Sequence, residues 1–421
     1  MKKIKHTAFY IPLGVDKDWL LGQIKEGLLF DFPASLQTMR GEIFSSSILQ
    51  YFIDEEIRHD IVEVATDHSS TLRYSSSGEQ KKALLTHLIA KKPAYLIIDG
   101  VFESLDKAAK QSILLTLQTL SATTLIFQIF SRKDELLPFI ETVFCIDERA
   151  ITGCYPPAEF RQVFSKESKN FSGTIPPPLS VFTIPKGPLV SMTDVSVQFN
   201  GRPILQHICW EINAGEFWQL AGPNGSGKST LLALITGDSA KGYGQNLLLF
   251  GVRKGSGESV WEIKKKIGYF TPVMSSQFER QDSIEQMIVS GFFDSVGLYI
   301  QPSDRQIQLA REWLVVIGMT SQKNKPFRFL SVGQQRMVLV ARAMVKHPPL
   351  LILDEPCAGL DDEMAAIFTT LIHTIAAETN TAILYVSHKD EAGLMPDKVF
   401  QLSPSAGGSI GSIEQRQVAT K

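Results

Sequence analysis

The apolar residues of the chain form short continuous runs, separated by stretches in which apolar positions lie three and four residues apart. Residues 95–98 form one run, which ends at Asp99, and residues 124–130 form another. Between them, residues 107–120 carry the helical spacing. This order of strand, helix and strand predicts a β-α-β unit, and therefore an α/β fold with a parallel sheet flanked by helices.

The remaining pattern sets the expected domain boundaries. Residues 1–70 have apolar positions at mixed helical spacing, so we expect this part to be mostly helical. Alternation at Val195, Val197 and Phe199 predicts the strand that opens a second domain. Clustered prolines favour an extended linker before it, and a Gly, Ser and Gln-rich end favours a flexible tail. The expected organisation is a first domain (1–146), a linker (147–188), a second domain (189–403) and a tail (404–421).

Composition excludes several classes of protein. The chain has 421 residues, of which 44% are hydrophobic and 20% charged, as in globular proteins with ample cores. Its 42 basic and 44 acidic residues nearly balance, so a nucleic-acid partner is not expected. No run of 18 apolar residues and no secretion-signal pattern occur, so we expect no membrane span. The four cysteines lack metal-binding spacing and predict reduced thiols in the cytoplasm.

One stretch carries the clearest chemistry. Residues 221–230 read Ala-Gly-Pro-Asn-Gly-Ser-Gly-Lys-Ser-Thr, which matches G-x-x-x-x-G-K-[ST], between an apolar strand at 217–220 and a helix at 231–235. Such a loop wraps backbone N–H groups around phosphates, with Lys228 reaching the β- and γ-phosphates and Ser229 reaching Mg²⁺. The predicted ATP-binding residues are Gly222, Pro223, Asn224, Gly225, Ser226, Gly227, Lys228, Ser229 and Thr230.

The chain also contains an internal repeat. A Ser-x-Gly segment precedes an apolar strand that ends in aspartate, once in each half of the chain. Gly78 and Asp99 are 21 residues apart, as are Gly333 and Asp354, and in both copies a further aspartate follows seven residues later. Equal spacings of this length predict two copies of one structural unit.

With these motifs in place, the second half resembles an ATP-binding-cassette (ABC) ATPase over residues 190–403. The motifs that carry the resemblance are Walker A (222–230), the signature (330–334), Walker B (350–355), the D-loop (358–361) and the switch histidine His388. Residues 289–299, with parts of 205–268, are similar to the tandem-cassette proteins associated with molybdate transport. The resemblance implies a P-loop fold with a mixed sheet and a helical subdomain.

The resemblance also implies roles for individual residues. Asp354 and Ser229 are expected to hold Mg²⁺, and Glu355 to activate the attacking water as general base. His388 is expected to hydrogen-bond the γ-phosphate, completing the predicted catalytic set with Lys228 and Glu355.

Two further positions are assigned by the resemblance to nucleotide binding. Phe199 stands where the family stacks an aromatic ring on adenine, although a core phenylalanine on an alternating strand is almost as good an interpretation. The Q-loop glutamine of the family is expected near Pro272, and the nearest glutamine in the sequence is Gln277.

ABC ATPases place ATP between the Walker A of one unit and the signature of the opposite unit. In this chain Ser76 and Gly78 of the first copy could close the site from within, which is the preferred hypothesis. In the alternative, Ser331 and Gly333 of a second chain close it in a homodimer.

The first copy departs from the family pattern. At a constant offset of 255 residues, Met1 falls opposite residue 256, so this copy is expected to start beyond any Walker A and to be truncated and degenerate. Gly100 and Arg132 stand where the second copy has Glu355 and His388. The first copy is therefore expected to bind no triphosphate.

The resemblance implies an ATPase without its own membrane domain. The first interpretation is that it energises import or handling of a small substrate such as molybdate, with a separate permease. The alternative is a soluble tandem cassette with a role in translation, on DNA or in regulation. The linker is rich in proline and only mildly basic, which ranks a translation-factor role lower.

Overall fold

The computed structural model describes residues 5–12, 16–27, 38–66, 71–102, 105–163, 173–183, 186–278, 281–387, 391 and 393–415. The chain divides into two compact units. The first comprises Met1–Glu167 with Gly359–Glu363, and the second comprises Ser168–Ala358 with Met364–Lys421. Within the described ranges, no helix is both long enough and apolar enough to cross a bilayer.

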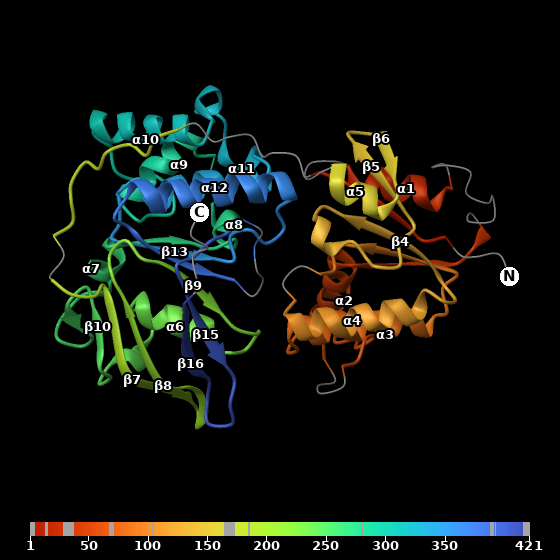
Figure 1. The fold of residues 1–421 in the computed structure, drawn as a ribbon, viewed down its shortest axis with the longest axis horizontal. Helices are drawn as coiled ribbons and strands as arrows, with labels where there is room; N and C mark the ends of the chain where they lie inside the picture. Colours follow the sequence, from red (N-terminus) through yellow and green to blue (C-terminus); the bar gives the residue numbers. More distant parts are fainter. Residues whose placement is uncertain are drawn as a thin grey trace. The chain divides into compact units, whose positions relative to one another are not determined.

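The first unit is a six-stranded sheet with helices on both faces (Figure 1). The strand order is β2-β3-β4-β1-β5-β6, parallel except for the antiparallel pair of β5 and β6. Helix α1 packs on one face of this sheet, and α3 and α4 pack on the other. The elements are β1 (Thr7–Tyr10), α1 (Lys17–Lys25), β2 (Gly41–Ser45), α2 (Ser46–His59), α3 (Ser77–Ala90), β3 (Tyr95–Asp99), α4 (Lys107–Leu120), β4 (Leu125–Phe130), β5 (Thr142–Asp147), β6 (Ala150–Tyr155) and α5 (Pro157–Val163).

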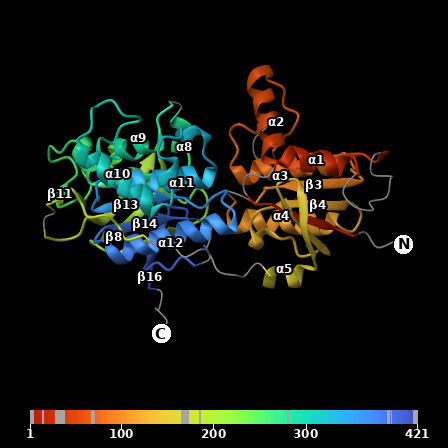
Figure 2. The same cartoon turned by 90° about the horizontal axis from the view of Figure 1, so that it is seen from above.

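The second unit combines two sheets with a group of helices (Figure 2). Its four-stranded antiparallel sheet has the order β11-β10-β7-β8, and its six-stranded sheet has the order β12-β13-β14-β9-β15-β16. The strands are β7 (Val190–Phe199), β8 (Arg202–Ile212), β9 (Phe217–Ala221), β10 (Leu247–Leu249), β11 (Val252–Arg253), β12 (Ile267–Phe270), β13 (Leu350–Asp354), β14 (Ala382–Val386), β15 (Lys398–Ser403) and β16 (Ile410–Gln415). The helices are α6 (Lys228–Ile235), α7 (Val260–Lys265), α8 (Met274–Gln277), α9 (Ile284–Val289), α10 (Asp304–Val316), α11 (Val332–Met344) and α12 (Asp362–Glu378).

The two six-stranded sheets have the same order, so that β1 corresponds to β9, β2 to β12 and β3 to β13. This supports the predicted repeat. The extrapolation that placed Met1 opposite residue 256 is wrong, however. Helix α3 begins 32 residues after β2 ends (Ser45 to Ser77), whereas α11 begins 62 residues after β12 ends (Phe270 to Val332). The constant offset fails because the first unit has about thirty fewer residues at this point.

Three other expectations need correction. Residues 1–70 contain strands β1 and β2 as well as helices α1 and α2. The predicted linker contains β6 and α5, because β6 pairs with β5 and a proline at the start of α5 is compatible with the first helical turn. The predicted flexible tail contains β16, which pairs with β15 along its whole length.

Candidate nucleotide site

The loop between β9 and α6 has a backbone that requires glycine at three positions. Gly222, Gly225 and Gly227 have φ angles of 155°, 76° and 90°, in the region that L side chains rarely enter. A Cβ at Gly222 would also lie 2.8 Å from the carbonyl oxygen of Leu402. The glycines of the sequence motif are therefore set by the conformation of the loop, which ends at the first turn of α6.

The N-terminus of α6 is suited to an anion. Because the residue before Lys228 is Gly227, no side chain caps the first amide groups of this helix. Uncapped amides at the positive end of a helix favour phosphate. The Lys228 ammonium donates to the carbonyl oxygens of Gly222 and Pro223, at 2.8 and 3.0 Å. The Ser226 hydroxyl is buried, with no hydrogen-bond partner in the described part of the chain. Amides, an ammonium and a hydroxyl therefore meet at one loop.

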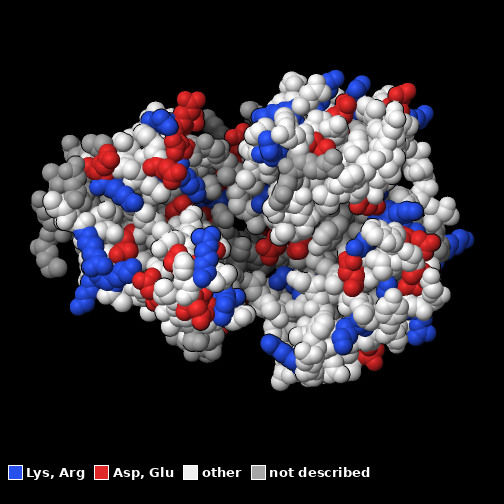
Figure 3. All heavy atoms as spheres, turned by 180° about the vertical axis from the view of Figure 1, so that it is seen from behind, with Lys and Arg blue, Asp and Glu red and all other residues white. Residues whose placement is uncertain are grey.

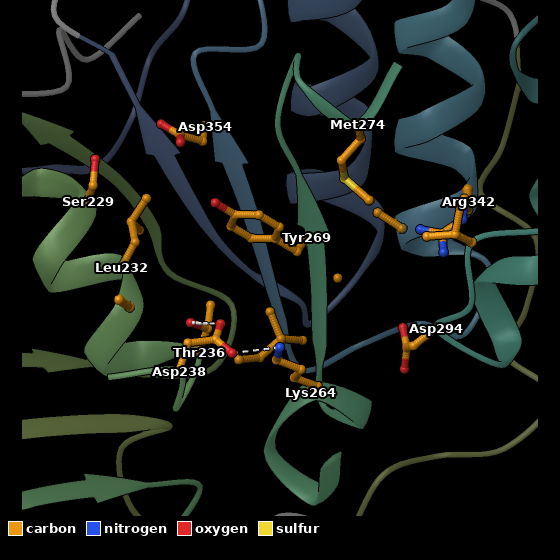
Figure 4. Close-up of a pocket in the computed structure, with 15 residues that line it drawn as sticks. Ser229, Leu232, Thr236, Asp238, Lys264, Tyr269, Met274, Asp294, Arg342 and Asp354 are labelled. Carbon is orange, nitrogen blue, oxygen red and sulfur yellow. Dashed lines mark hydrogen bonds and ion pairs between the residues drawn. The ribbon is translucent and has the colours of Figure 1, made fainter. Parts of the chain in front are cut away.

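An oxygen-ligand pair lies next to this loop. Ser229 and Asp354 line one cavity of about 350 Å³, at the carboxyl end of β13 (Figure 4). Burial is the main cause that raises the pKa of Asp354 to about 6, and the negative charge of Glu355 also raises it. The positive charge of Lys228 acts in the opposite direction and lowers this pKa. A divalent cation would favour the charged carboxylate. A hydroxyl and a carboxylate are ligands that Mg²⁺ accepts together with substrate phosphates, so these residues fit the metal.

Glu355 is held in an unusual backbone conformation directly after β13. Its φ angle is 46°, and its N–H donates to the carbonyl oxygen of Val386 at 2.9 Å. In the first unit Gly100 follows β3 and has a φ of 59°. The turn is therefore kept in both units, while the carboxylate is present only in the second.

The two Ser-x-Gly segments have the same local structure. Ser331 caps α11 and Ser76 caps α3, each through a reciprocal capping box with the residue three positions later. In the second unit that residue is the neutral Gln334. In the first it is Glu79, whose carboxylate accepts from both the Ser76 amide (2.8 Å) and the Ser76 hydroxyl (2.7 Å). The Ser76 hydroxyl proton is therefore already bound by an anion.

Comparisons with known proteins agree with this geometry. The family profile described as ABC transporter matches residues 205–358. The chain is 38% identical over 331 residues to the ABC transporter ATP-binding protein ModF of Escherichia coli, covering 76% of this chain and 67% of that protein. The chain belongs to the ABC ATPase family. An uncharacterized ABC transporter ATP-binding protein of Schizosaccharomyces pombe is 29% identical, with 76% and 66% covered, so the chain spans about two thirds of both relatives.

Solved structures support the fold of this ABC ATPase along most of its length. The archaeal ribosome recycling factor aABCE1, in complex with the stalk protein aP1, matches 97% of this chain and 85% of its own. The TM-score is 0.65 and the sequence identity 12%, so this likeness concerns the fold alone.

Two residues assigned from the family pattern do not line the cavity of Ser229 and Asp354, and a third lies outside the described residues. Gln277 ends α8 with an exposed side chain and does not line the cavity of Ser229 and Asp354. Phe199 ends β7 with 45% of its surface exposed, and the Lys241 ammonium lies 5.6 Å from its ring centre. His388 lies outside the described residues, so its role stays a prediction.

Sequence reasoning missed the counterpart of the phosphate loop in the first unit. After β1, α1 begins at Lys17 and is capped by Asp16, whose carboxylate accepts from the Trp19 amide at 3.0 Å. The Lys17 ammonium is bound to Asp99 at 2.8 Å, and Arg149 binds Asp16 at 2.7 Å. A carboxylate thus caps the helix end that is open in α6. Strand order, and not a sequence motif, identifies this site.

Proposed function

We propose that the second unit of this ABC ATPase binds and hydrolyses MgATP, and that the first unit binds no triphosphate. The observation that supports the proposal most is the contrast between the two helix N-termini. In α6 the first amides are uncapped beside Lys228, whereas in α1 Asp16 caps them and Lys17 is neutralised by Asp99.

Within the site, the proposed roles follow from position. The amides of α6 and Lys228 bind the β- and γ-phosphates, and Ser229 and Asp354 hold the cation. Bound Mg²⁺ supplies positive charge that neutralises phosphate oxygens. Glu355 orients a water and takes its proton as that water attacks the γ-phosphorus, while the bond between the γ-phosphorus and the bridging oxygen breaks and ADP leaves with that oxygen; His388 hydrogen-bonds the γ-phosphate.

We also propose that hydrolysis energises import or handling of a small substrate such as molybdate, on the cytoplasmic side of a membrane and with a separate permease. The likeness to ModF supports an ATP-binding subunit of this class. A second relative, from Thermotoga maritima, is named a probable metal transport system ATP-binding protein and is 29% identical over 48% of this chain.

The alternative is a role in translation, on DNA or in regulation. The likeness to aABCE1 concerns the fold, so it supports this alternative only through a similar architecture. On the face shown in Figure 3, basic and acidic side chains are interspersed, and the net charge is −2, which does not favour a nucleic-acid partner.

Two lysines at corresponding positions provide the test. Lys228→Met is expected to lower ATP turnover by about 100-fold or more, because it removes a charged donor to the phosphates. Lys17→Met, at the first residue of α1, is expected to leave turnover and the single bound ATP unchanged. Phosphate release and calorimetric ATP titration measure both. Equal loss in the two variants would contradict the assignment of the site to the second unit.

The substrate is tested in cells. Cells producing the Lys228→Met protein are expected to contain less molybdenum, by mass spectrometry, than cells producing wild-type protein. Unchanged molybdenum with ATP-dependent co-sedimentation on ribosomes would instead support the translation role.

A further inference from the structure

The second unit lacks a glutamine at the position where the resemblance to its family predicts the Q-loop residue, and a tyrosine three residues earlier lines the nucleotide cavity. The segment after β12 reads Thr-Pro-Val, and Gln277 is exposed on α8. The cavity beside the phosphate loop is lined instead by Tyr269 of β12, together with Ser229 and Asp354. A role for this tyrosine in nucleotide binding rests on the proposed ATP site.

The sheet register places Tyr269 on the same face as Asp354. Strands β12 and β13 are parallel, and Tyr269 is paired with Ile352. Because side chains alternate between faces along a strand, Asp354, two residues beyond Ile352, points to the same side of the sheet. Figure 4 shows the Tyr269 hydroxyl directed toward the end of the cavity where Ser229 and Asp354 lie.

The Tyr269 hydroxyl makes no hydrogen bond to any of the residues that the structure describes. The tyrosine ring packs against the core of the unit, so the ring alone would be satisfied by a phenylalanine. A half-buried hydroxyl normally finds a partner, since leaving one unpaired is costly.

The surroundings show what kind of partner this is. Burial first, and then the negative charge of Asp354, raises the pKa of Tyr269 to about 12, so the phenol keeps its proton and can act as a donor. The other acidic side chains of the cavity already have partners, since Asp238 accepts from Thr236 and pairs with Lys264, and Asp294 pairs with Lys346. The end of the cavity with Ser229 and Asp354 is the proposed site of the cation and the phosphates, so a bound nucleotide would bring acceptor oxygens there.

We propose that the Tyr269 hydroxyl is a nucleotide-binding group of this site, donating a hydrogen bond to bound MgATP in place of the missing Q-loop glutamine. The acceptor is an oxygen of the γ-phosphate or of a water on the cation. Both present the same oxygen chemistry, and the metal dependence of binding distinguishes them.

The test is Tyr269→Phe in the full chain, which removes the hydroxyl and keeps the ring. Tyr243→Phe is the matched control, because Tyr243 is 55% exposed and outside the cavity. Affinity for a fluorescent ATP analogue is expected to fall about tenfold to 100-fold in Tyr269→Phe, as for loss of one hydrogen bond to a charged group. The melting temperature without nucleotide is expected to stay at the wild-type value, because no protein partner is lost.

Binding is measured with Mg²⁺ and again with EDTA. A loss seen in both conditions assigns the acceptor to the γ-phosphate, and a loss seen only with Mg²⁺ assigns it to a cation-bound water. Wild-type affinity of Tyr269→Phe in both conditions would overturn the proposal, as would a loss confined to Gln277→Ala. Because Lys228→Met tests the ATP site itself, failure of the tyrosine role and failure of the site give different results.

Discussion

At the residue scale, Asp354 gives the second unit a pH dependence of its own. Its pKa is raised to about 6 in the folded protein, from an ordinary value of 3.8. Between these two values the folded state binds more protons than the unfolded state, so this group lowers the free energy of unfolding as pH rises. Protonated Asp354 stabilises the fold below this window, and that stabilisation is lost as pH rises through 6.

Asp354→Asn is therefore expected to stabilise the metal-free second unit. At pH 7 in EDTA the gain is about 1–3 kcal/mol, and it disappears toward pH 4, where the aspartate is itself neutral. Urea unfolding followed by tryptophan fluorescence measures this, since four of the five tryptophans lie in the second unit. Added Mg²⁺ and ATP should stabilise the wild type and not the variant. A destabilised variant at pH 7 would contradict this account of the carboxylate.

Some residues of the candidate site could be predicted from the sequence, and others could not. The glycines around Lys228 were predictable because a phosphate loop fixes both residue type and spacing. Tyr269 was not, because its role depends on the register of β12 against β13, which no local spacing reveals. Lys17 was not, because its ion pair with Asp99 joins residues 82 positions apart.

At the element scale, the close packing of α11 against β12 fixes the position of the strand that carries Tyr269. Gly268 precedes it, and a Cβ there would lie 2.5 Å from the carbonyl oxygen of Ala343 and 2.9 Å from Pro348. The first contact is backbone, so the strand or the helix has to shift. Gly268→Ala is expected to lower unfolding stability by about 1–3 kcal/mol and to weaken ATP binding.

Differential scanning calorimetry with nucleotide titration checks both effects of Gly268→Ala. Gly22→Ala is the control, because Gly22 lies inside α1 with no atom within 4 Å of an added Cβ. Alanine is the better helix former, so this control is expected to be neutral or slightly stabilising. If Gly268→Ala melts at the wild-type temperature, the contact between β12 and α11 accommodates the added Cβ, which would contradict this prediction.

The elements were predictable in proportion to their length and pattern. The strand at 95–99 and the helix at 107–120 were found with their observed bounds, because a buried run and a clear period leave one interpretation. The four-residue β1 is too short to show a period, so only tertiary pairing with β4 and β5 identifies it. The prolines in residues 147–188 led to the wrong prediction that this whole segment is a linker, since Pro157 starts a helix there.

At the scale of the whole molecule, the open question is which signature completes the ATP site. The first unit of the same chain offers Ser76, but Glu79 holds its hydroxyl proton and would bring a negative charge toward the γ-phosphate. A second chain offers Ser331, beside the neutral Gln334. This difference now favours pairing between chains over the closure by Ser76 and Gly78 that the sequence alone favoured.

Light scattering on Glu355→Gln with Mg²⁺ and ATP decides between them, because a site that cannot hydrolyse ATP accumulates in its closed state. We expect an ATP-dependent dimer of the 46.7 kDa chain, which the further change Ser331→Arg abolishes without lowering the melting temperature. The change Glu79→Gln, added to Glu355→Gln, should leave that mass unaltered. A monomer that retains one ATP would instead assign closure to Ser76 and Gly78. In that case Glu79→Gln alone, by removing a charge next to the phosphates, would raise ATP turnover.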